Sequence, residues 1–384
     1  MPTKTLRLIL SGGGTGGHVY PALAVAHALA DQAHVVYVGS VGGMEERIVA
    51  RESRLPFRAL PAAAVRGRGP VQATRALITL LRGVIAAGHL LAREQPAAIL
   101  GTGGYVCVPL FVAARLRRVP TMIYLPDVVP GLAVRMLSRI ADLTAVNVSD
   151  SLPRLGLREG DRRALVTGYP VRDELFTTDR ATARAAFGIP PDQTVLLVYG
   201  GSRGARSINR AIAALLPTLL PLCTIIHVCG REGDQVWLEE AAARLDPALR
   251  ERYLLFPYLE SGHAQSMTAA LVAADVTVCR SGASTLAELP AVGLPAVLVP
   301  YPYVHQDENA DYLVQRGAAL KVADHAMLGD GAPAEGPLAR AIRQLVNDQE
   351  KRKQMAARSR ALARPDAAQR LAEALLDLAS RSSA

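Results

Sequence analysis

Short apolar runs alternate with longer stretches of helical periodicity along the whole chain. In the first half, the runs predict buried strands at residues 7–10, 35–38, 98–100, 121–124 and 143–146. The pattern then restarts, with runs at residues 194–199, 224–228, 253–256, 276–279 and 296–299. Strands that alternate with helices form parallel sheets with helices on both faces. We therefore predict an α/β protein with two doubly wound domains, each with its ligand edge at the carboxyl ends of its strands.

Glycine and proline interrupt this periodicity near the middle of the chain, at Gly168 and Pro170. We place the domain boundary there, which gives domains of residues 1–167 and 168–384. A chain of 384 residues is long enough for two such domains. Stretches rich in Ala, Leu and Arg at residues 340–363 and 365–380 predict two terminal helices.

Composition narrows the possible partners. The net charge of +9 favours anionic ligands such as phosphates or anionic lipid. Only 4% of the residues are aromatic, and we see no stacking platform or zinc-finger spacing, so a nucleic-acid partner is not expected.

The four cysteines lack CxxC spacing and indicate reduced, buried thiols. The first apolar run is too short for a secretory signal, and no run reaches ~18 uninterrupted apolar residues. We expect a cytoplasmic protein that can rest on a membrane surface.

A glycine-rich turn follows the first predicted strand and leads into a helix, with His18 at its end. Glycines let the backbone approach a ligand closely, and a helix N-terminus attracts anions. Residues 12–17 match the glycine spacing of a dinucleotide site, but no carboxylate follows the second strand, which weakens a nicotinamide interpretation. An imidazole at this edge could take a proton from a sugar hydroxyl. The alternatives are an empty turn and a histidine that only hydrogen bonds within its loop.

Three further polar segments follow strands in the second half. Residues 200–206 form a second glycine turn suited to a pyrophosphate, unless it is an empty turn. Glu288 is predicted on the first turns of a helix, where it could bind two ribose hydroxyls or only complement the helix dipole. Gln306 and Asn309 supply amides suited to sugar hydroxyls. The neighbouring His305, Asp307 and Glu308 are not spaced as three ligands on one face, so no metal site is predicted.

Taken in order, these segments resemble one known family. The similar stretches are residues 13–24, 103–106, 168–172, 200–205 and 279–283, together with Glu288. They look like the MurG family of glycosyltransferase family 28, which are UDP-N-acetylglucosamine:lipid I N-acetylglucosaminyltransferases. The resemblance runs from about residue 8 to about residue 320, and its motifs are specific jointly rather than singly.

The resemblance implies a GT-B fold, in which two Rossmann-like domains face each other across a cleft and the last helix packs back on the first domain. It implies inverting transfer of N-acetylglucosamine from UDP-N-acetylglucosamine to the C4 hydroxyl of the MurNAc sugar of lipid I, which is undecaprenyl-pyrophosphoryl-MurNAc-pentapeptide. The product would be lipid II, for peptidoglycan synthesis. It implies no cofactor and no metal.

The resemblance also assigns roles to individual residues. His18 is the candidate catalytic base. The implied donor-binding residues are Thr15, Gly16, Gly17, Arg172, Ser202, Arg203, Gly204, Leu259, Ser281, Gly282, Glu288, Gln306 and Asn309. The implied acceptor-binding residues are Gly14, Thr15, His18, Tyr105 and Asp127.

The chain departs from the family pattern at three places. The family usually carries His-Glu-x-Asn after the strand at 121–124, where this chain continues Leu125-Pro126-Asp127. Arg203 replaces the usual glutamine, and the segment at 260–266 is longer. The missing motif leaves two alternatives: a divergent transferase for another lipid acceptor, and a nucleotide-sugar-binding protein without turnover. A third alternative is a UDP-N-acetylglucosamine 2-epimerase, which shares the two-domain architecture but would need acid/base carboxylates in its cleft.

Basic residues accompany apolar ones in two predicted helices of the first domain. The first helix has four arginines beside its apolar residues: Arg66, Arg68, Arg75 and Arg82 accompany Leu77, Ile78, Leu80, Leu81, Val84 and Ile85. In the second, an apolar run is flanked by Arg115, Arg117 and Arg118. This combination suits an anionic membrane surface. The alternative is a core-facing helix with a solvated basic edge.

Overall fold

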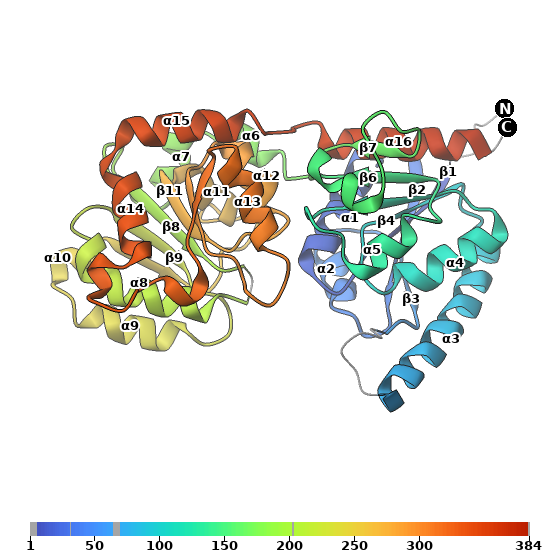
Figure 1. Cartoon of the computed structure of the whole chain (residues 1–384), viewed down its shortest axis with the longest axis horizontal. Coiled ribbons are helices and arrows are strands. Elements are labelled where there is room, and N and C mark those ends of the chain that lie inside the picture. Colours follow the sequence, from blue (N-terminus) through green and yellow to red (C-terminus); the bar gives the residue numbers. More distant parts are fainter. Residues whose placement is uncertain (1–5, 31, 64–69, 202, 383–384) are drawn as a thin grey trace. The chain divides into compact units, whose positions relative to one another are not determined.

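The computed structural model describes residues 6–30, 32–63, 70–201 and 203–382 (Figure 1). The chain divides into two compact units. The first unit contains residues 1–171 and 364–384, and the second contains residues 172–363. The division falls between Val171 and Arg172, whereas the boundary predicted from the sequence lies four residues earlier, between residues 167 and 168.

The described part of the first unit contains a seven-stranded parallel sheet with the order β3-β2-β1-β4-β5-β6-β7. Its strands are β1 (Leu6–Ser11), β2 (Ala33–Ser40), β3 (Phe57–Leu60), β4 (Ala98–Gly101), β5 (Thr121–Leu125), β6 (Leu143–Val146) and β7 (Ala164–Val166). Its helices are α1 (Gly16–Ala28), α2 (Met44–Glu52), α3 (Pro70–Glu94), α4 (Cys107–Arg117), α5 (Leu132–Leu137) and α16 (Ala367–Ser382), with 3₁₀ turns η1 (Ser149–Ser151) and η2 (Pro153–Leu155).

The strands of this sheet are apolar on both faces because helices cover both. Successive side chains of a strand point to opposite faces. Accordingly, Leu8 and Leu10 lie in a core with residues of α1 and α16, whereas Ile9 lies in a second core with residues of α3 and α4. Through Leu371 and Leu375, α16 shares the first of these cores with Val19 of α1. The last helix of the chain is therefore part of the first unit.

The described part of the second unit contains a six-stranded parallel sheet with the order β10-β9-β8-β11-β12-β13. Its strands are β8 (Val195–Tyr199), β9 (Thr224–Val228), β10 (Tyr253–Phe256), β11 (Val276–Cys279), β12 (Ala296–Leu298) and β13 (Ala319–Lys321). Its helices are α6 (Glu174–Thr177), α7 (Arg180–Ala186), α8 (Arg206–Leu219), α9 (Gln235–Ala243), α10 (Pro247–Arg250), α11 (Met267–Ala273), α12 (Thr285–Val292), α13 (Asp307–Gln315), α14 (Pro337–Asn347) and α15 (Gln349–Arg360), with 3₁₀ turns η3 (Asp324–Ala326) and η4 (Pro333–Glu335).

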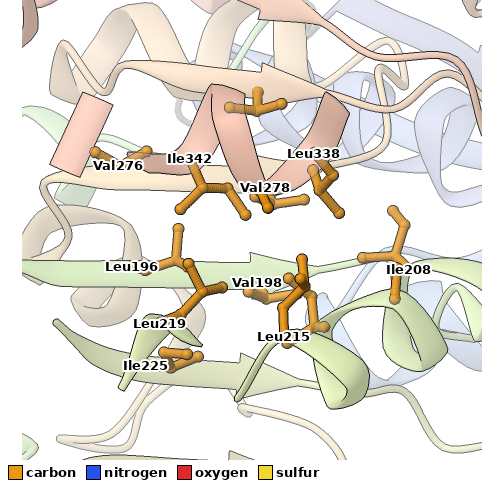
Figure 2. Close-up of a cluster of buried hydrophobic side chains, with 14 of the residues drawn as sticks. Leu196, Val198, Ile208, Leu215, Leu219, Ile225, Val276, Val278, Leu338 and Ile342 are labelled. Atoms are coloured by element: carbon orange, nitrogen blue, oxygen red, sulfur yellow. The ribbon is translucent and has the colours of Figure 1, made fainter. Parts of the chain in front are cut away.

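A core of leucine, isoleucine and valine side chains fixes the second sheet against two helices. Figure 2 shows Leu196 and Val198 of β8 facing Leu215 of α8 and Ile342 of α14. These side chains are fully buried. The packing holds α8 against β8, so the loop between them lies at the carboxyl edge of the sheet, where ligands bind in such folds.

The two predicted α/β domains with parallel sheets are confirmed, and all ten predicted strands are present. Three strands were not predicted, namely β3, β7 and β13. Each is an edge strand of its sheet and is only three or four residues long. The predicted helix at residues 340–363 is wrong as a single helix. Asp348 adopts an extended conformation between α14 and α15, and its carboxylate accepts a hydrogen bond from the Lys351 amide as an N-cap.

Candidate functional site

The carboxyl edge of the first sheet brings two glycine turns together. The loop between β1 and α1 carries Gly13, whose N–H donates to the carbonyl of Gly103 after β4 at 3.2 Å. A Cβ on Gly104 would lie 2.5 Å from the Gly13 carbonyl oxygen, and Gly103 and Gly104 both have positive φ. Only glycine satisfies this close approach without strain. The backbone of both turns is thus fixed around His18.

His18 lies at the start of α1 and is half-buried. Its Nδ1 is 3.0 Å from the carbonyl oxygen of Gly13 and 3.2 Å from the hydroxyl oxygen of Thr15. A carbonyl oxygen only accepts, so the contact with Gly13 requires a proton on Nδ1. The other ring nitrogen, Nε2, is then the acceptor in the neutral imidazole. This tautomer suits a general base.

The other residues predicted to bind the acceptor lie in the same turn as His18 and on two other loops. Gly14 and Thr15 are exposed in the same turn as His18, and Tyr105 is 45% exposed directly after Gly104. Asp127 is half-buried after β5, and its backbone carbonyl accepts a hydrogen bond from the Ser151 hydroxyl at 3.3 Å. Gly14, Thr15 and His18 are therefore brought together in one turn, whereas Asp127 lies on a separate loop.

The second unit has its own glycine turn, between β8 and α8. Gly204 has a φ of +87° and lies against the carbonyl group of Cys229 at the end of β9. Arg203 is 84% exposed in its side chain and forms an ion pair with Glu232. Ser202, predicted to bind the donor pyrophosphate, lies outside the described residues. Gly16 and Gly17, also predicted to bind the donor, lie at the N-terminus of α1 in the first unit.

In the second unit, the charge of Arg172 affects the pKa of Glu288. Glu288 is on the first turn of α12, and its carboxylate accepts a hydrogen bond from the Ser284 hydroxyl at 3.1 Å. Burial raises the pKa of Glu288, while the Ser284 hydrogen bond and the charge of Arg172 oppose that rise. Arg172 also donates to the Ser261 hydroxyl at 2.7 Å, within the segment that is longer than the family pattern.

Most of the remaining residues predicted to bind the donor are joined by hydrogen bonds around the turn after β11. The Ser281 hydroxyl donates to the Gln306 carbonyl at 2.8 Å, and the Asn309 amide donates to the Ser281 carbonyl at 3.0 Å. The side-chain oxygen of Gln306 accepts from the Tyr301 N–H at 3.0 Å. Gly282 lies beside Gln306, where an added Cβ would be 3.9 Å from its side-chain nitrogen. Leu259 is buried after β10.

Sequence reasoning assigned no role to Arg280, which holds this edge of the second sheet together. Its side chain is 11% exposed and donates to the carbonyls of Val299 and Pro300 at 3.1 Å. It also pairs with Asp324 and donates to the Ser207 hydroxyl at 2.8 Å. An arginine directly after an apolar strand was the available signal, because such a side chain needs several acceptors when buried. Among the described residues, no group of three or more His, Cys, Asp or Glu side chains is placed to bind a metal.

A buried hydrogen-bond network around His227 packs against the second glycine turn. The ring nitrogens of His227 contact the Tyr253 hydroxyl at 2.8 Å and the Asn209 side-chain oxygen at 3.0 Å. Asn209 in turn donates to the Asp234 carboxylate and to the carbonyl of Cys229, against which Gly204 packs. Burial lowers the pKa of His227 to about 3, with the charge of Asp234 opposing. His227 is therefore neutral in the folded protein at neutral pH.

The buried, neutral His227 leads us to expect that the protein loses stability in acid. Because the pKa of His227 is lower in the folded than in the unfolded chain, the unfolded chain binds a proton first as the pH falls below about 6.5. Between pH 7 and pH 5 the free energy of unfolding falls by about 2 kcal/mol through this group alone. Urea unfolding of the wild type and His227→Gln at both pH values measures it. The variant loses about 2 kcal/mol less than the wild type over this interval, and equal losses would contradict the assignment.

Comparison with known proteins places both units in one family. Residues 8–146 match the glycosyltransferase family 28 N-terminal domain, and residues 195–371 match its C-terminal domain. A UDP-N-acetylglucosamine–N-acetylmuramyl-(pentapeptide) pyrophosphoryl-undecaprenol N-acetylglucosamine transferase of Roseiflexus sp. is 59% identical, over 98% of this chain and 96% of that protein. The enzyme of the same description from Desulforudis audaxviator is 39% identical, over 98% and 99%.

Solved structures agree with this assignment. The crystal structure of Acinetobacter baumannii MurG is 26% identical, with a TM-score of 0.76 over 97% of this chain and 99% of that one. A UDP-GlcNAc 2-epimerase from Neisseria meningitidis has a TM-score of 0.67 over 97% and 100%, but at 15% identity it shares only the fold. With both family domains matched and whole-length relatives of 59% and 39% identity, this chain belongs to the MurG family of N-acetylglucosamine transferases in glycosyltransferase family 28.

Proposed function

We propose that this chain transfers N-acetylglucosamine from UDP-N-acetylglucosamine to the C4 hydroxyl of MurNAc in lipid I, with inversion, and so forms lipid II. The observation that carries the proposal is the 59% identity to the Roseiflexus transferase over 98% of the chain. The 2-epimerase alternative is not favoured, because its likeness rests on the fold alone.

The acceptor chemistry is assigned to the turn that holds His18. The C4 oxygen of the acceptor attacks the anomeric carbon from the face opposite the UDP group. The bond between that carbon and the phosphate oxygen breaks, and UDP leaves with the electron pair. His18 Nε2 takes the proton of the attacking hydroxyl, because its Nδ1 is held as a donor to Gly13. Gly14, Thr15, Tyr105 and Asp127 are proposed to contact the acceptor.

Most residues proposed to bind the donor belong to the second unit, and Thr15, Gly16 and Gly17 of the first unit are the others. The Glu288 carboxylate accepts hydrogen bonds from the ribose hydroxyls, and Leu259 lies against the uracil. Arg172, Ser202, Arg203 and Gly204 surround the pyrophosphate, where negative charge develops as UDP departs. Positive groups fixed at that position stabilise the transition state more than the ground state. The transfer needs no cofactor.

Gln306 and Asn309 contribute differently to the donor sugar. Gln306 is half-buried beside Gly282 and is proposed to bind the sugar hydroxyls together with Ser281. Asn309 is 0% exposed and donates to the Ser281 carbonyl. We infer that Asn309 acts by fixing the turn that carries Ser281 and Gly282.

Incubation of radiolabelled UDP-N-acetylglucosamine with defined lipid acceptors tests the activity. The proposal expects label on lipid I. Label transferred only to another polyprenyl-linked acceptor would indicate the divergent transferase, and a free or UDP-linked epimer would indicate the 2-epimerase. Binding of the nucleotide sugar without any of these products would indicate a binding protein.

Exposed apolar side chains on α3 support contact with a membrane surface. Leu77, Ile78, Leu81 and Ile85 are between 47% and 64% exposed, beside exposed Arg75 and Arg82. In the described chain, Thr74–Glu94 is the one helix whose length and composition would allow a membrane span, and 22% of that window is buried. Its Ala76, Ala87 and Leu91 are buried in the protein. We propose that α3 lies on the cytoplasmic face of the membrane and binds anionic lipid. Arg66 and Arg68 lie outside the described residues.

Ile85→Glu is expected to weaken binding to vesicles of anionic phospholipid by at least about tenfold. Removing one apolar side chain from the interface costs about 1.5 kcal/mol, and the added carboxylate is repelled by the lipid. Vesicle sedimentation measures the change. Val236→Glu is the control, since Val236 on α9 is also 64% exposed but belongs to the second unit. Equal effects of the two variants would exclude α3 as the specific contact.

A further inference from the structure

A buried carboxylate supports the turn that carries His18. Glu45 lies in the first turn of α2 and is 0% exposed. Its carboxylate accepts hydrogen bonds from the Ser40 N–H at 2.7 Å, from the Ser40 hydroxyl, and from the Gly14 N–H at 3.4 Å. One side chain thus joins the end of β2 to the glycine turn after β1.

Three glycines shape the space that Glu45 occupies. A Cβ on Gly13 would lie 2.6 Å from a carboxylate oxygen of Glu45, and a Cβ on Gly39 would lie 2.7 Å from its Cγ. A Cβ on Gly43 would also collide with the carboxylate. The glycines come from the turn after β1, from the end of β2 and from the N-cap of α2. Side chains larger than hydrogen at these positions would displace the carboxylate.

Burying a carboxylate costs free energy unless hydrogen bonds replace its water. In the described part of the chain, the donors to Glu45 are two amides and a hydroxyl rather than an arginine or lysine. Hydrophobic packing alone would be served better by an apolar side chain of similar volume. The arrangement instead gives directional bonds to the backbone of a particular turn.

The backbone of this turn contacts the His18 ring and so sets its tautomer. Glu45 holds the N–H of Gly14 and lies against Gly13, and the Gly13 carbonyl accepts the Nδ1–H of His18. The peptide unit between Gly13 and Gly14 contains both the carbonyl that binds the imidazole and the N–H that binds the carboxylate. A rotation of this one peptide plane would break both hydrogen bonds.

We propose that Glu45 is a positioning residue for His18: by fixing the Gly13–Gly14 peptide, it holds the imidazole with its proton on Nδ1 and its acceptor on Nε2. The kinetic consequence rests on the proposed function, because it assumes that His18 takes a proton from the acceptor. The tautomer itself does not depend on that assumption.

The test compares Glu45→Gln with Glu46→Gln. Glu46 is the matched control, since it is the next residue in the same helix turn but is exposed. Glutamine keeps the size of the side chain but replaces one acceptor oxygen by an NH₂ group, which cannot accept from an amide. The ¹⁵N spectrum of histidine-labelled protein, with the His18 signals assigned by their absence in His18→Ala, reports which ring nitrogen carries the proton.

We expect Glu45→Gln to shift the His18 ring signals toward a mixture of tautomers and to lower kcat about five- to tenfold. The KM for UDP-N-acetylglucosamine changes less than twofold, and Glu46→Gln leaves all three quantities unchanged. A folded Glu45→Gln protein with wild-type ring signals and wild-type kcat would overturn the proposal.

If Glu45→Gln does not unfold cooperatively, Ser40→Ala takes its place, because it removes one donor to the carboxylate. We expect a smaller change in the same ring signals, and unchanged signals would overturn the proposal. A wild-type protein that transfers no sugar would refute the proposed function, while the comparison of ring signals would still decide the role of Glu45.

Discussion

Replacing His18 by alanine is expected to lower kcat by about 10²–10⁴-fold, which is the usual contribution of a positioned general base. The acceptor hydroxyl must lose its proton as its oxygen bonds to the anomeric carbon. His18 is the proposed base, because the contact of its Nδ1 with Gly13 leaves Nε2 as the acceptor nitrogen of the neutral ring. Donor affinity is expected to stay near the wild-type value, because His18 is not among the residues assigned to donor binding.

Single-turnover transfer to lipid I and calorimetric binding of UDP-N-acetylglucosamine separate these two effects. His27→Ala is the matched control, since His27 lies on the same helix but is exposed. It is expected to retain wild-type turnover. Turnover of the His18 variant within a few-fold of the wild type would remove His18 from the role of base.

Glu288→Ala gives the second large expected effect, on donor binding. The ribose hydroxyls lose a charged acceptor, which costs about 1–3 kcal/mol, equivalent to about five- to 150-fold in the dissociation constant for UDP. Calorimetry with UDP measures the loss. Glu240→Ala on α9, which removes an exposed carboxylate from the same unit, is the control. If both variants bind UDP equally well, Glu288 does not bind the ribose.

The same carboxylate predicts a pH dependence. The ionised form is the better acceptor for ribose hydroxyls, so UDP affinity falls as Glu288 becomes protonated. Because burial raises the pKa of Glu288, this loss begins at a higher pH than it would for an exposed glutamate. The acid limb is absent in Glu288→Ala if Glu288 is responsible.

The repeated strand pattern was predictable because helices cover both faces of each sheet, so that central strands such as residues 195–199 are continuously apolar. The short strands near the sheet edges gave too little pattern. The break at Asp348 was missed because helix-forming residues continue on both sides of it, and the Asp348 side chain that caps the next helix was not recognised as an N-cap.

The glycine turns could be predicted because their backbone demands appear directly as residue type. The supporting residues could not, because their partners are distant in sequence. Nothing in the local sequence pairs Glu45 with Gly14, which is 31 positions away. The same holds for Arg280, after β11, and Asp324, after β13, which meet across the end of β12 only once the sheet has formed. For Asn309, the amide suggested a contact with sugar, whereas its burial indicates support of the Ser281 turn.

The stereochemistry of the product shows whether the sugar is transferred by a direct displacement at the anomeric carbon. The disaccharide formed from UDP-N-acetylglucosamine and lipid I is released from its lipid pyrophosphate by mild acid. The linkage between its two sugars is then examined by proton NMR. Direct displacement assisted by His18 predicts a β linkage from the anomeric carbon of N-acetylglucosamine to the C4 oxygen of MurNAc. An α linkage, a linkage to another oxygen, or the appearance of the 2-epimer in place of a disaccharide would contradict the account.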